Sequence, residues 1–515
     1  MNGAEALIST LSKAGVEVCF ANPGTSEMQL VAAIDQHPEM RAVLCLFEGV
    51  VTGAADGYGR MADKPAATLL HLGPGLGNGV ANLHNARRAR SPILNIVGDH
   101  AVDHLKFNAP LTSDIVGVAT PVSDAVLTST SADHLAELGA VGFATALDYP
   151  GKVVTLIAPA DHAWTEAKGP AAVVERAPAP KASASAIDAA CEALKNSDGP
   201  AALFMGGMAL REDALEQAGR IAAATGARLL CETFMARLQR GEGRVPVERL
   251  PYFGEMAADY LKDFRTLIMV GAKPPVAFFA YPGKPGWLSP EGANIVTLAE
   301  PREDAKAALK ALADALDAPA EHGKAQARFA PPAPTGKLDA AGIGAVLTEL
   351  MPDDAIVSDE AATAGLAIFP MTMGAPRHDW ITTTGGAIGQ GLPAGIGAAI
   401  ACPDRKTICL QADGSGMYTV QSLWTMAREN LDILTIIINN GSYAILNIEL
   451  MRVGVANPGP KALSLLDLTH PKLQWTAIAE GMGVSAARAE TVSEFRAAFR
   501  DALEQKGPRL IEAVI

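Results

Sequence analysis

The sequence is short of cysteine, of basic charge and of long apolar runs, and each shortage excludes a class of protein. Its six cysteines include no CxxC pair, which argues against structural zinc and against a disulfide framework and fits a reducing compartment. The net charge of −14 leaves no basic stripe for a nucleic-acid backbone. No apolar run approaches the ~20 residues of a membrane span, and the N-terminus has no basic-then-apolar signal. We therefore expect a soluble, cytoplasmic protein with neither nucleic acid nor membrane as partner.

What is present indicates a large globular α/β protein. Hydrophobic residues make up 49% of the 515 residues and charged residues 19%, and this length suggests about three domains. Two stretches rich in Pro and Ala, 168–186 and 318–336, have no core pattern and read as linkers. Short buried strands alternate with helices, as in doubly wound parallel sheets. The expected strands are 16–20, 43–47, 68–71, 93–97, 202–205, 228–231, 266–270, 433–438 and 509–514. We expect domains at 1–168, 188–316 and 337–515.

The stretch 412–443 is the most informative part of the chain. An apolar run ends at the acidic turn Asp413-Gly414-Ser415, a helical segment follows, and the β-branched run 433–438 ends at Asn439-Asn440-Gly441. This pattern predicts a strand–helix–strand unit with oxygen ligands at both strand ends, where open parallel sheets bind ligands.

The chemistry that these residues suit is a divalent cation holding a diphosphate. Asp413 offers a carboxylate, Asn440 an amide oxygen and Ser442 a loop carbonyl, and Mg²⁺ takes its remaining oxygens from phosphate and water. A helix start after Ser415 would add free N–H groups to the same place. The alternative is a helix-capping Asp and an ordinary polar turn.

This stretch resembles the binding motif of the thiamine-diphosphate-dependent enzymes, with Ala412 in place of the motif's first Gly. The resemblance covers the whole chain and is strongest to benzoylformate decarboxylase and acetolactate-synthase-like proteins. It implies three domains (pyrimidine-binding, central and diphosphate-binding), with thiamine diphosphate and Mg²⁺ as cofactors. It also implies a set of site residues: metal ligands Asp413, Asn440 and Ser442, and cofactor contacts from Gly414, Ser415, Tyr443 and Thr363.

Glu48 stands where the run 43–47 stops and a helix of small residues begins. A carboxylate at a helix start is common, because the helix dipole favours it there. The resemblance implies more, since Glu48 matches the catalytic glutamate that binds a ring nitrogen of the cofactor's pyrimidine and promotes loss of the reactive carbon's proton. The His that often precedes this glutamate is replaced by Phe47.

Two further residues of the first domain are catalytic candidates by resemblance. Thr25, after Asn22-Pro23-Gly24, matches a hydroxyl that contacts the substrate carboxylate in benzoylformate decarboxylase; the alternative is an N-cap for the helix near Ser26. His71 matches a proton-relaying His of that enzyme, although a lone strand-end His is more often structural. His100 and His104 read either as a second relay or, as we favour, a polar loop. The glycine run 73–79 lacks proper GxGxxG spacing, so a dinucleotide site is a weak alternative.

The segment 384–391 places many glycines around the bulky Ile388. By resemblance, Ile388 wedges the cofactor into a bent shape and the Gly386 carbonyl accepts a hydrogen bond from its amino group, a near-attack arrangement. The alternative is a glycine-rich packing loop before a helix.

The resemblance leaves the reaction open between two enzymes. Benzoylformate decarboxylases convert a 2-oxo acid to an aldehyde without oxidation, and acetolactate synthases join the remaining fragment to a second carbonyl. Pro110 and Leu111 stand where the synthases have Phe and Gln, and Ile445 and Leu446 lie near the place of their Trp, which favours the decarboxylase. Against it, residues 274–281 lack the decarboxylase's second His. A catalytically silent assembly or regulatory protein is the non-enzyme alternative. The family arrangement also implies a homodimer or homotetramer with sites at the subunit interface.

Overall fold

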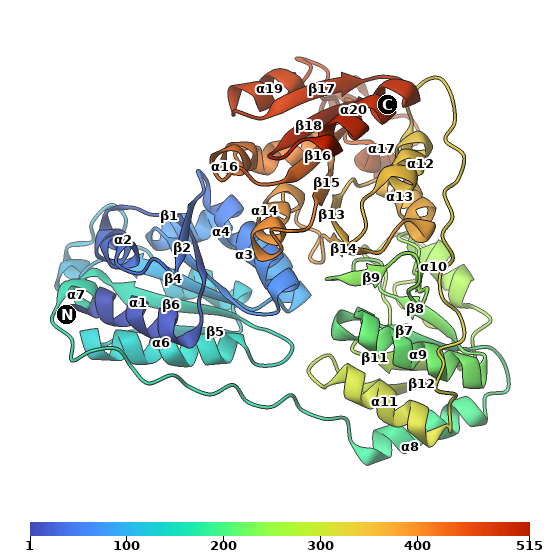
Figure 1. Cartoon of the computed structure of the whole chain (residues 1–515), viewed down its shortest axis with the longest axis horizontal. Coiled ribbons are helices and arrows are strands. Elements are labelled where there is room, and N and C mark those ends of the chain that lie inside the picture. The colour runs from blue at the N-terminus through green and yellow to red at the C-terminus, as the bar shows by residue number, and fades with distance from the viewer.

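Three mainly parallel sheets, joined by two extended segments, make up the chain, and the computed structural model describes all 515 residues (Figure 1). No helix or strand lies between Trp164 and Ala184, or between Ala315 and Ala340. The first of these segments runs along the lower edge of the molecule in Figure 1, and the second climbs its right side. The prediction of an α/β protein with three doubly wound sheets is confirmed.

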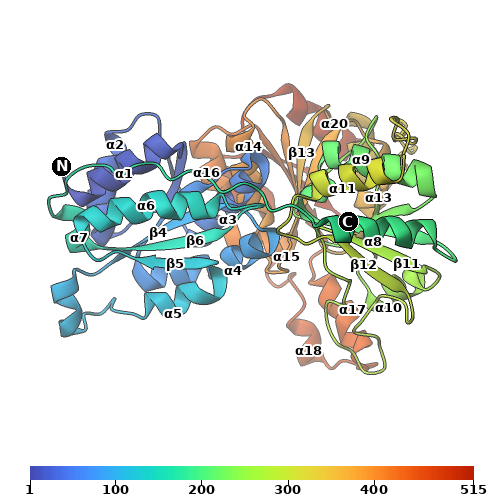
Figure 2. The same cartoon turned by 90° about the horizontal axis from the view of Figure 1, so that it is seen from below.

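The first part is a six-stranded parallel sheet with strand order β2-β1-β3-β4-β6-β5. Helices α1 and α6 cover one face and α4 and α5 the other (Figure 2). Its strands are β1 (Val18–Asn22), β2 (Arg41–Leu44), β3 (Ala66–Leu70), β4 (Ile93–Asp99), β5 (Ala125–Thr128) and β6 (Val153–Pro159). Its α-helices are α1 (Gly3–Ala14), α2 (Met28–Asp35), α3 (Glu48–Ala62), α4 (Leu72–Ala89), α5 (Ile115–Ala119), α6 (Ala132–Ala146) and α7 (Ala160–Trp164).

The central part is a five-stranded sheet of order β10-β8-β7-β11-β12. Its first helix, α8, begins at Ala184, four residues before the predicted start of this domain at 188. The strands are β7 (Ala201–Met205), β8 (Arg228–Cys231), β10 (Glu248–Arg249), β11 (Thr266–Val270) and β12 (Asn294–Ala299), and the helices are α8 (Ala184–Lys195), α9 (Glu212–Thr225), α10 (Gly254–Leu261) and α11 (Ala305–Ala315).

The third part is a seven-stranded sheet of order β17-β18-β16-β15-β13-β14-β9. Its strands are β13 (Ala355–Glu360), β14 (His378–Thr382), β15 (Thr407–Ala412), β16 (Ile433–Asn439), β17 (Ser485–Ala489) and β18 (Arg509–Val514). The larger helices are α12 (Ala340–Leu350), α13 (Gly365–Met371), α14 (Gly391–Ala401), α16 (Ser422–Arg428), α17 (Ala444–Arg452), α19 (Trp475–Gly481) and α20 (Val492–Glu504), with short α15 (Asp413–Gly416) and α18 (Pro460–Ser464).

The edge strand β9 (Leu238–Arg240) was not predicted. It comes from the sequence range of the central part but pairs antiparallel with β14 of the third. Arg237, just before it, places a guanidinium nitrogen 3.1 Å from the buried carboxylate of Asp379 in β14. A strand from the sequence range of the central part therefore forms one edge of the third part's sheet.

Several predicted boundaries differ from the structure. The run 43–47 was expected to be a strand throughout, but β2 ends at Leu44 and Leu46 is 47% exposed. The first strand was expected at 16–20 and instead runs to Asn22. The helix expected after Ser415 begins at Asp413. The glycine run 73–79 forms the first turns of α4.

Helices α3 and α14 cross in close contact and join the first part to the third. A Cβ at Gly57 would lie 2.0 Å from the Ala394 carbonyl oxygen, and one at Gly397 would lie 1.9 Å from that of Ala54. Only residues without side chains let two helix backbones approach this closely. The contact matters for function because Glu48 begins α3 and the segment 384–390 leads into α14.

Candidate functional site

The ends of β15 and β16 bring the acidic turn and the Asn-Asn-Gly turn together. The strands are parallel neighbours, with Ala412 opposite Ile438. The buried Asp413 carboxylate accepts a hydrogen bond from Gly441 N at 2.8 Å. The amide oxygen of Asn440 accepts from Ser442 N at 3.0 Å. The sequence pattern therefore corresponds to one continuous edge in the fold.

The possible metal ligands along this edge are oxygen atoms. Burial raises the pKa of Asp413, although backbone N–H groups of Gly414 and Gly441 oppose that shift; a cation beside it would favour the ionised form. The chain has no group of three or more His, Cys, Asp or Glu side chains placed so that they could hold a metal ion together. A cation held by Asp413, Asn440 and the Ser442 carbonyl would therefore take further oxygens from phosphate and water. These donors fit a Mg²⁺–diphosphate group.

Glycine at 414 and 441 is required by the local geometry. A Cβ at Gly414 would lie 2.4 Å from the ring of Tyr443, and Gly441 has φ of +66°. Ser415 is buried, and its hydroxyl is 2.6 Å from Gln411 Nε2, so it is held inside the turn. Tyr443 is thus packed over the turn that carries Asp413, as a member of the same cluster.

The segment 384–390 is anchored by Glu360, the last residue of β13. One carboxylate oxygen accepts from Gly389 N and the other from Gly391 N, each at 2.6 Å. Burial raises the pKa of Glu360 to about 7, against the opposing effect of these hydrogen bonds. Ile388 is 37% exposed and Gly386 has φ of +75°. The loop is thus fixed at its base, while the Ile388 side chain faces outward.

Thr363 lies in the turn after β13, and its side chain makes no hydrogen bond within the chain. Ala362 before it has φ of +48°, which is uncommon for a residue with a side chain. The position of Thr363 at the carboxyl end of a strand next to β15 is compatible with its predicted contact to diphosphate.

Glu48 is the first residue of α3 and is 6% exposed. Its Oε2 accepts a hydrogen bond from Asn78 Nδ2 at 3.0 Å. A Cβ on Gly75 would be 3.2 Å from Glu48 Oε1 and 3.3 Å from His71 Cβ. Glu48 and His71 therefore flank the same glycine at the carboxyl edge of the first sheet.

His71 is held by a buried carboxylate that sequence reasoning missed. Its Nδ1 lies 2.8 Å from Glu27 Oε2, and Glu27 is fully buried. Gly24 N also donates to Glu27, at 2.8 Å, and a Cβ at Gly24 would lie 2.2 Å from His71 Nδ1. With the Nδ1 proton directed to Glu27, Nε2 is the free nitrogen of the ring.

Thr25 is exposed and begins the 3₁₀ turn Thr25–Glu27. The alternative of an N-cap is wrong, since Gly24 occupies the cap and Thr25 makes no side-chain hydrogen bond. Its hydroxyl is free for the predicted substrate contact.

His100 and His104 form one tilted ring pair, with centroids 5.4 Å apart. His100 directly follows β4, and His104 lies within the 3₁₀ segment Val102–Phe107. Nε2 of His100 is buried without a hydrogen-bond partner. Neither imidazole is hydrogen-bonded to His71.

Two groups of predicted residues therefore form within one chain. The first joins Asp413, Gly414, Ser415, Asn440, Ser442 and Tyr443; the second joins Glu48, His71 and Thr25. Gly386 and Ile388 lie beside the second, because Asn82 Nδ2 reaches both the Gly49 and the Gly389 carbonyl oxygens, at 2.7 and 3.2 Å. No hydrogen bond joins Asp413 to Glu48 within one chain.

Fold and site together define the class. Family descriptions match both outer parts: "Thiamine pyrophosphate enzyme, N-terminal TPP binding domain" over residues 1–118, and "Thiamine pyrophosphate enzyme, C-terminal TPP binding domain" over 363–513. A Mycobacterium tuberculosis protein is 52% identical over all of this chain and 99% of its own length. The chain belongs to the thiamine pyrophosphate enzymes, and its two outer parts are the family's cofactor-binding domains.

The relatives bear two kinds of name. The Mycobacterium tuberculosis protein is named "Putative acetolactate synthase large subunit IlvX". Benzoylformate decarboxylase of Pseudomonas aeruginosa is 28% identical over 98% of this chain and 96% of its own. Among solved structures, the Rhodococcus jostii thiamine diphosphate-dependent 4-hydroxybenzoylformate decarboxylase superposes with a TM-score of 0.87 at 25% identity, covering 100% of this chain and 99% of the other.

None of the helices combines the length and the apolar character that a membrane span requires.

Proposed function

We propose that the protein is a thiamine-diphosphate- and Mg²⁺-dependent 2-oxo acid decarboxylase that releases an aldehyde, as benzoylformate decarboxylase does. The observation that carries the proposal is the His71–Glu27 pair beside Glu48. Release of an aldehyde requires a proton to be delivered to carbon after CO₂ leaves. An imidazole oriented through Nδ1, with Nε2 free, is suited to that delivery.

The cofactor, when bound, supplies the carbon nucleophile and electron sink for loss of CO₂. Glu48 would hold a proton at its carboxylate against the pyrimidine ring, and Asn78 orients that carboxylate. Ile388 and the Gly386 carbonyl would fix the ring geometry. Asp413, Asn440 and Ser442 would hold the Mg²⁺–diphosphate end. Thr25 would bind the substrate carboxylate through its hydroxyl, which is free of internal partners.

A second function is acetolactate-synthase-like carboligation, and the 52% identity to a protein of that name favours it. The two reactions share the decarboxylation and differ in whether a proton or a second carbonyl takes the place of CO₂. The presence of His71 with its carboxylate partner supports the decarboxylase.

We also propose a homodimer or homotetramer with shared sites. Within one chain no hydrogen bond joins the Asp413 group to the Glu48 group. In the family arrangement, closed two-fold symmetry pairs the first domain of one copy with the third domain of another, which would complete each site. Mass photometry alongside activity at decreasing protein concentration tests this. A fully active monomer would exclude it.

The function is tested by a panel of 2-oxo acids with thiamine diphosphate and Mg²⁺, measuring CO₂ and identifying products by mass. We expect CO₂ with one equivalent of aldehyde. CO₂ with a carbon–carbon-coupled product would establish the carboligase instead, and no CO₂ from any acid would indicate the catalytically silent alternative.

A further inference from the structure

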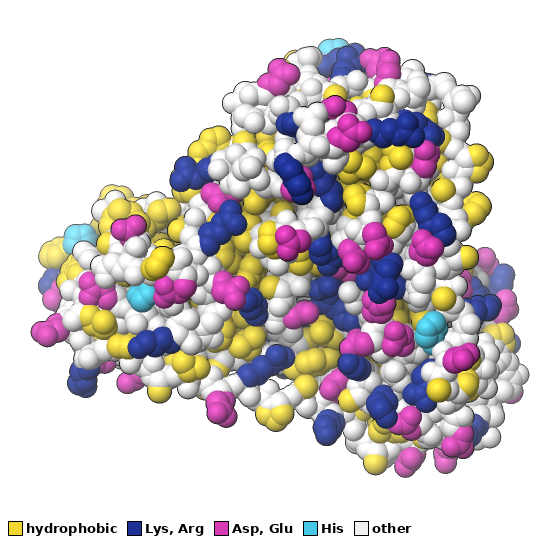
Figure 3. All heavy atoms as spheres, in the orientation of Figure 1, with side chains coloured by type: hydrophobic (Ala, Val, Ile, Leu, Met, Phe, Trp, Pro, Cys, Tyr) yellow, Lys and Arg dark blue, Asp and Glu magenta, His cyan; other side chains and the backbone are white.

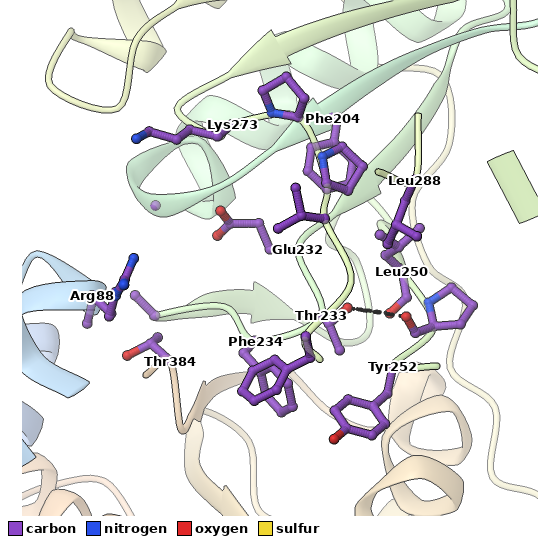
Figure 4. Close-up of a pocket in the computed structure, with 18 of the residues that line it drawn as sticks. Arg88, Phe204, Glu232, Thr233, Phe234, Leu250, Tyr252, Lys273, Leu288 and Thr384 are labelled. Carbon is purple, nitrogen blue, oxygen red and sulfur yellow. Dashed lines mark hydrogen bonds between the residues drawn. The ribbon is translucent and has the colours of Figure 1, made fainter. Parts of the chain in front are cut away.

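A cavity of about 350 Å³ lies where the three parts meet. Its walls come largely from residues at the carboxyl ends of β7, β8, β10 and β11, the edge at which open α/β sheets bind ligands. Arg88 from α4 and Thr384 of the third part lie close together on one side of it (Figure 4). Nothing in the proposed reaction uses this space.

One side of the cavity is strongly cationic. Arg88, Arg90 and Lys273 line it, and all three also line an adjoining cavity of about 390 Å³ that contains Arg302. None of these four side chains makes a salt bridge or a hydrogen bond within the chain. Burial lowers the pKa of Arg90, and the nearby Arg302 lowers it further, whereas Glu232 acts in the opposite direction. Unpaired cations that converge in an acidic protein favour an anionic ligand.

Glu232 is the one carboxylate that lines the 350 Å³ cavity, and it is a poor counter-ion; Asp124, in the adjoining cavity, is paired with Arg87. Glu232 points into the cavity (Figure 4), and its burial raises the pKa to about 7, against the influence of Arg90. A Cβ at Gly206 would lie 2.8 Å from its carboxyl carbon, so this glycine makes room for it. Near neutral pH a large fraction of Glu232 is protonated and can donate a hydrogen bond to an anion.

The opposite wall is aromatic and leads to the loop of the candidate active site. Phe234 packs against Tyr252 and Phe278, with ring centroids 5.9 and 5.4 Å apart. A Cβ at Gly386 would lie 2.5 Å from the Phe278 ring, so that ring rests on the loop that carries Ile388. The cavity therefore has an apolar wall that contacts the loop of the proposed reaction centre and, opposite it, a cluster of cations. On the face drawn in Figure 3, by contrast, Lys and Arg side chains are interspersed with Asp and Glu.

We propose that this cavity binds the far end of the 2-oxo acid, and that the preferred substrate has an apolar body and a second anionic group, a carboxylate or phosphate, remote from its carbonyl. The inference rests on the proposed function and specifies its substrate class. The aromatic wall would contact the body, and Lys273, Arg88 and Arg90 would pair with the terminal anion. Charge-assisted hydrogen bonds are strong and geometrically specific.

The test uses the holoenzyme and straight-chain 2-oxo diacids of five to eight carbons, each matched to the 2-oxo monoacid of equal length. We expect kcat/KM for the best diacid to exceed that of its monoacid by about 10- to 100-fold, the size of one or two hydrogen bonds to a charged group. Lys273→Met and Arg90→Met should reduce this ratio at least about tenfold. The control Lys310→Met removes a lysine on the exposed side of α11 and should leave the ratio unchanged.

A binding measurement separates the tail site from catalysis. Suberate, a diacid without the reactive carbonyl, should raise the Tm of the holoenzyme more than octanoate does, and Lys273→Met should abolish the difference. CO₂ release with a diacid-to-monoacid ratio near one, in wild type and variants alike, would overturn the tail site and leave the proposed function standing. No CO₂ from any acid would overturn the proposed function, and this inference with it.

Discussion

His71 and Glu27 lie 44 residues apart in sequence and 2.8 Å apart in the fold, Nδ1 to Oε2, with the carboxylate wholly buried. A Cβ added to Gly98 of β4 would lie only 1.7 Å from Glu27 Oε1, so the carboxylate fills the space that this glycine leaves. The imidazole is therefore oriented by packing around its partner as well as by the hydrogen bond.

The pair should behave as one unit. Glu27→Gln should slow turnover on the order of 10²-fold by releasing the orientation of His71. The double variant Glu27→Gln/His71→Ala should be no slower than His71→Ala alone, because groups that act together are non-additive. Single-turnover rates of the three variants provide the measurement. Multiplicative losses would mean that Glu27 acts independently of His71.

Glu48 and His71 should act in different steps of the reaction. Glu48→Gln should slow deuterium exchange at the reactive carbon of bound cofactor by at least about 10²–10⁴-fold, whereas His71→Ala should leave exchange nearly intact and slow turnover. Acid quench followed by proton NMR measures exchange in both. Equal loss of exchange in the two variants would contradict this order of roles, and no effect of His71→Ala on either would make it a structural histidine.

Asp413→Ala should abolish Mg²⁺-dependent binding of thiamine diphosphate, since it removes the site's only carboxylate. Calorimetric titration with cofactor, with and without Mg²⁺, measures this. Asp432→Ala is the matched control. Asp432 lies just before β16, at the strand end opposite Asn440, and its Oδ1 is 2.7 Å from Lys406 Nζ. Binding in the Asp413 variant equal to that in the control would refute the metal assignment.

Ile388→Ala should impair catalysis while leaving stability largely intact. Its side chain is 37% exposed, so truncation should cost under about 1 kcal/mol. Ile396→Ala, fully buried in α14, should cost about 2–5 kcal/mol. Urea denaturation and kcat measured on both variants test the contrast. Normal turnover in Ile388→Ala would mean that the residue does not shape the cofactor.

Glu360 should make the stability of the apoprotein depend on pH. Its pKa is about 7 in the fold against a usual 4.5. The native state therefore holds a proton that the unfolded state has lost between these values, and stability falls as pH rises from about 4.5 to 7 and levels off above. The full change in the free energy of unfolding is roughly 3.5 kcal/mol, at about 1.4 kcal/mol per pH unit.

Glu360→Gln should remove this slope, although it also costs stability at every pH because one loop N–H loses its acceptor. Urea denaturation at intervals from about pH 4.5 to about pH 8 gives the profile. Glu480→Gln, at an exposed position, is the control and should retain the slope. A profile for Glu360→Gln that runs parallel to wild type would assign the pH dependence to other groups.

The fold was largely predictable because its buried strands are short apolar runs with clear ends. The strands at 228–231, 266–270 and 509–514 have the predicted bounds. The strand predicted at 43–47 was too long because the apolar residues continue past the end of the sheet, where Phe47 is the N-cap residue of α3. The short strand β9 has no pattern of its own, and it pairs with a strand far along the chain, Leu238 opposite Trp380.

The predicted site residues occupy two strand-edge groups, as their motifs indicated, and their roles remain predictions. Glu27, Asn78 and the anchoring role of Glu360 were missed for one reason. Each acts through a partner 29 to 44 residues distant, such as Asn78 on Glu48 or Glu360 on Gly389. Such contacts depend on which strands become neighbours. The spacing of residues along the chain does not indicate these contacts. The one local hint is that Glu27 follows the Thr25 loop directly.

Because β9 pairs with β14, the third sheet includes a strand that is synthesised long before the rest of that sheet. On the ribosome, residues 238–240 emerge well before the strand they cover, and they must remain available until β14 forms. A fragment limited to 337–515 would leave the β14 edge open and Asp379 without Arg237, and exposed edges of this kind recruit other chains. By covering this edge, β9 would keep the third sheet from pairing with other chains.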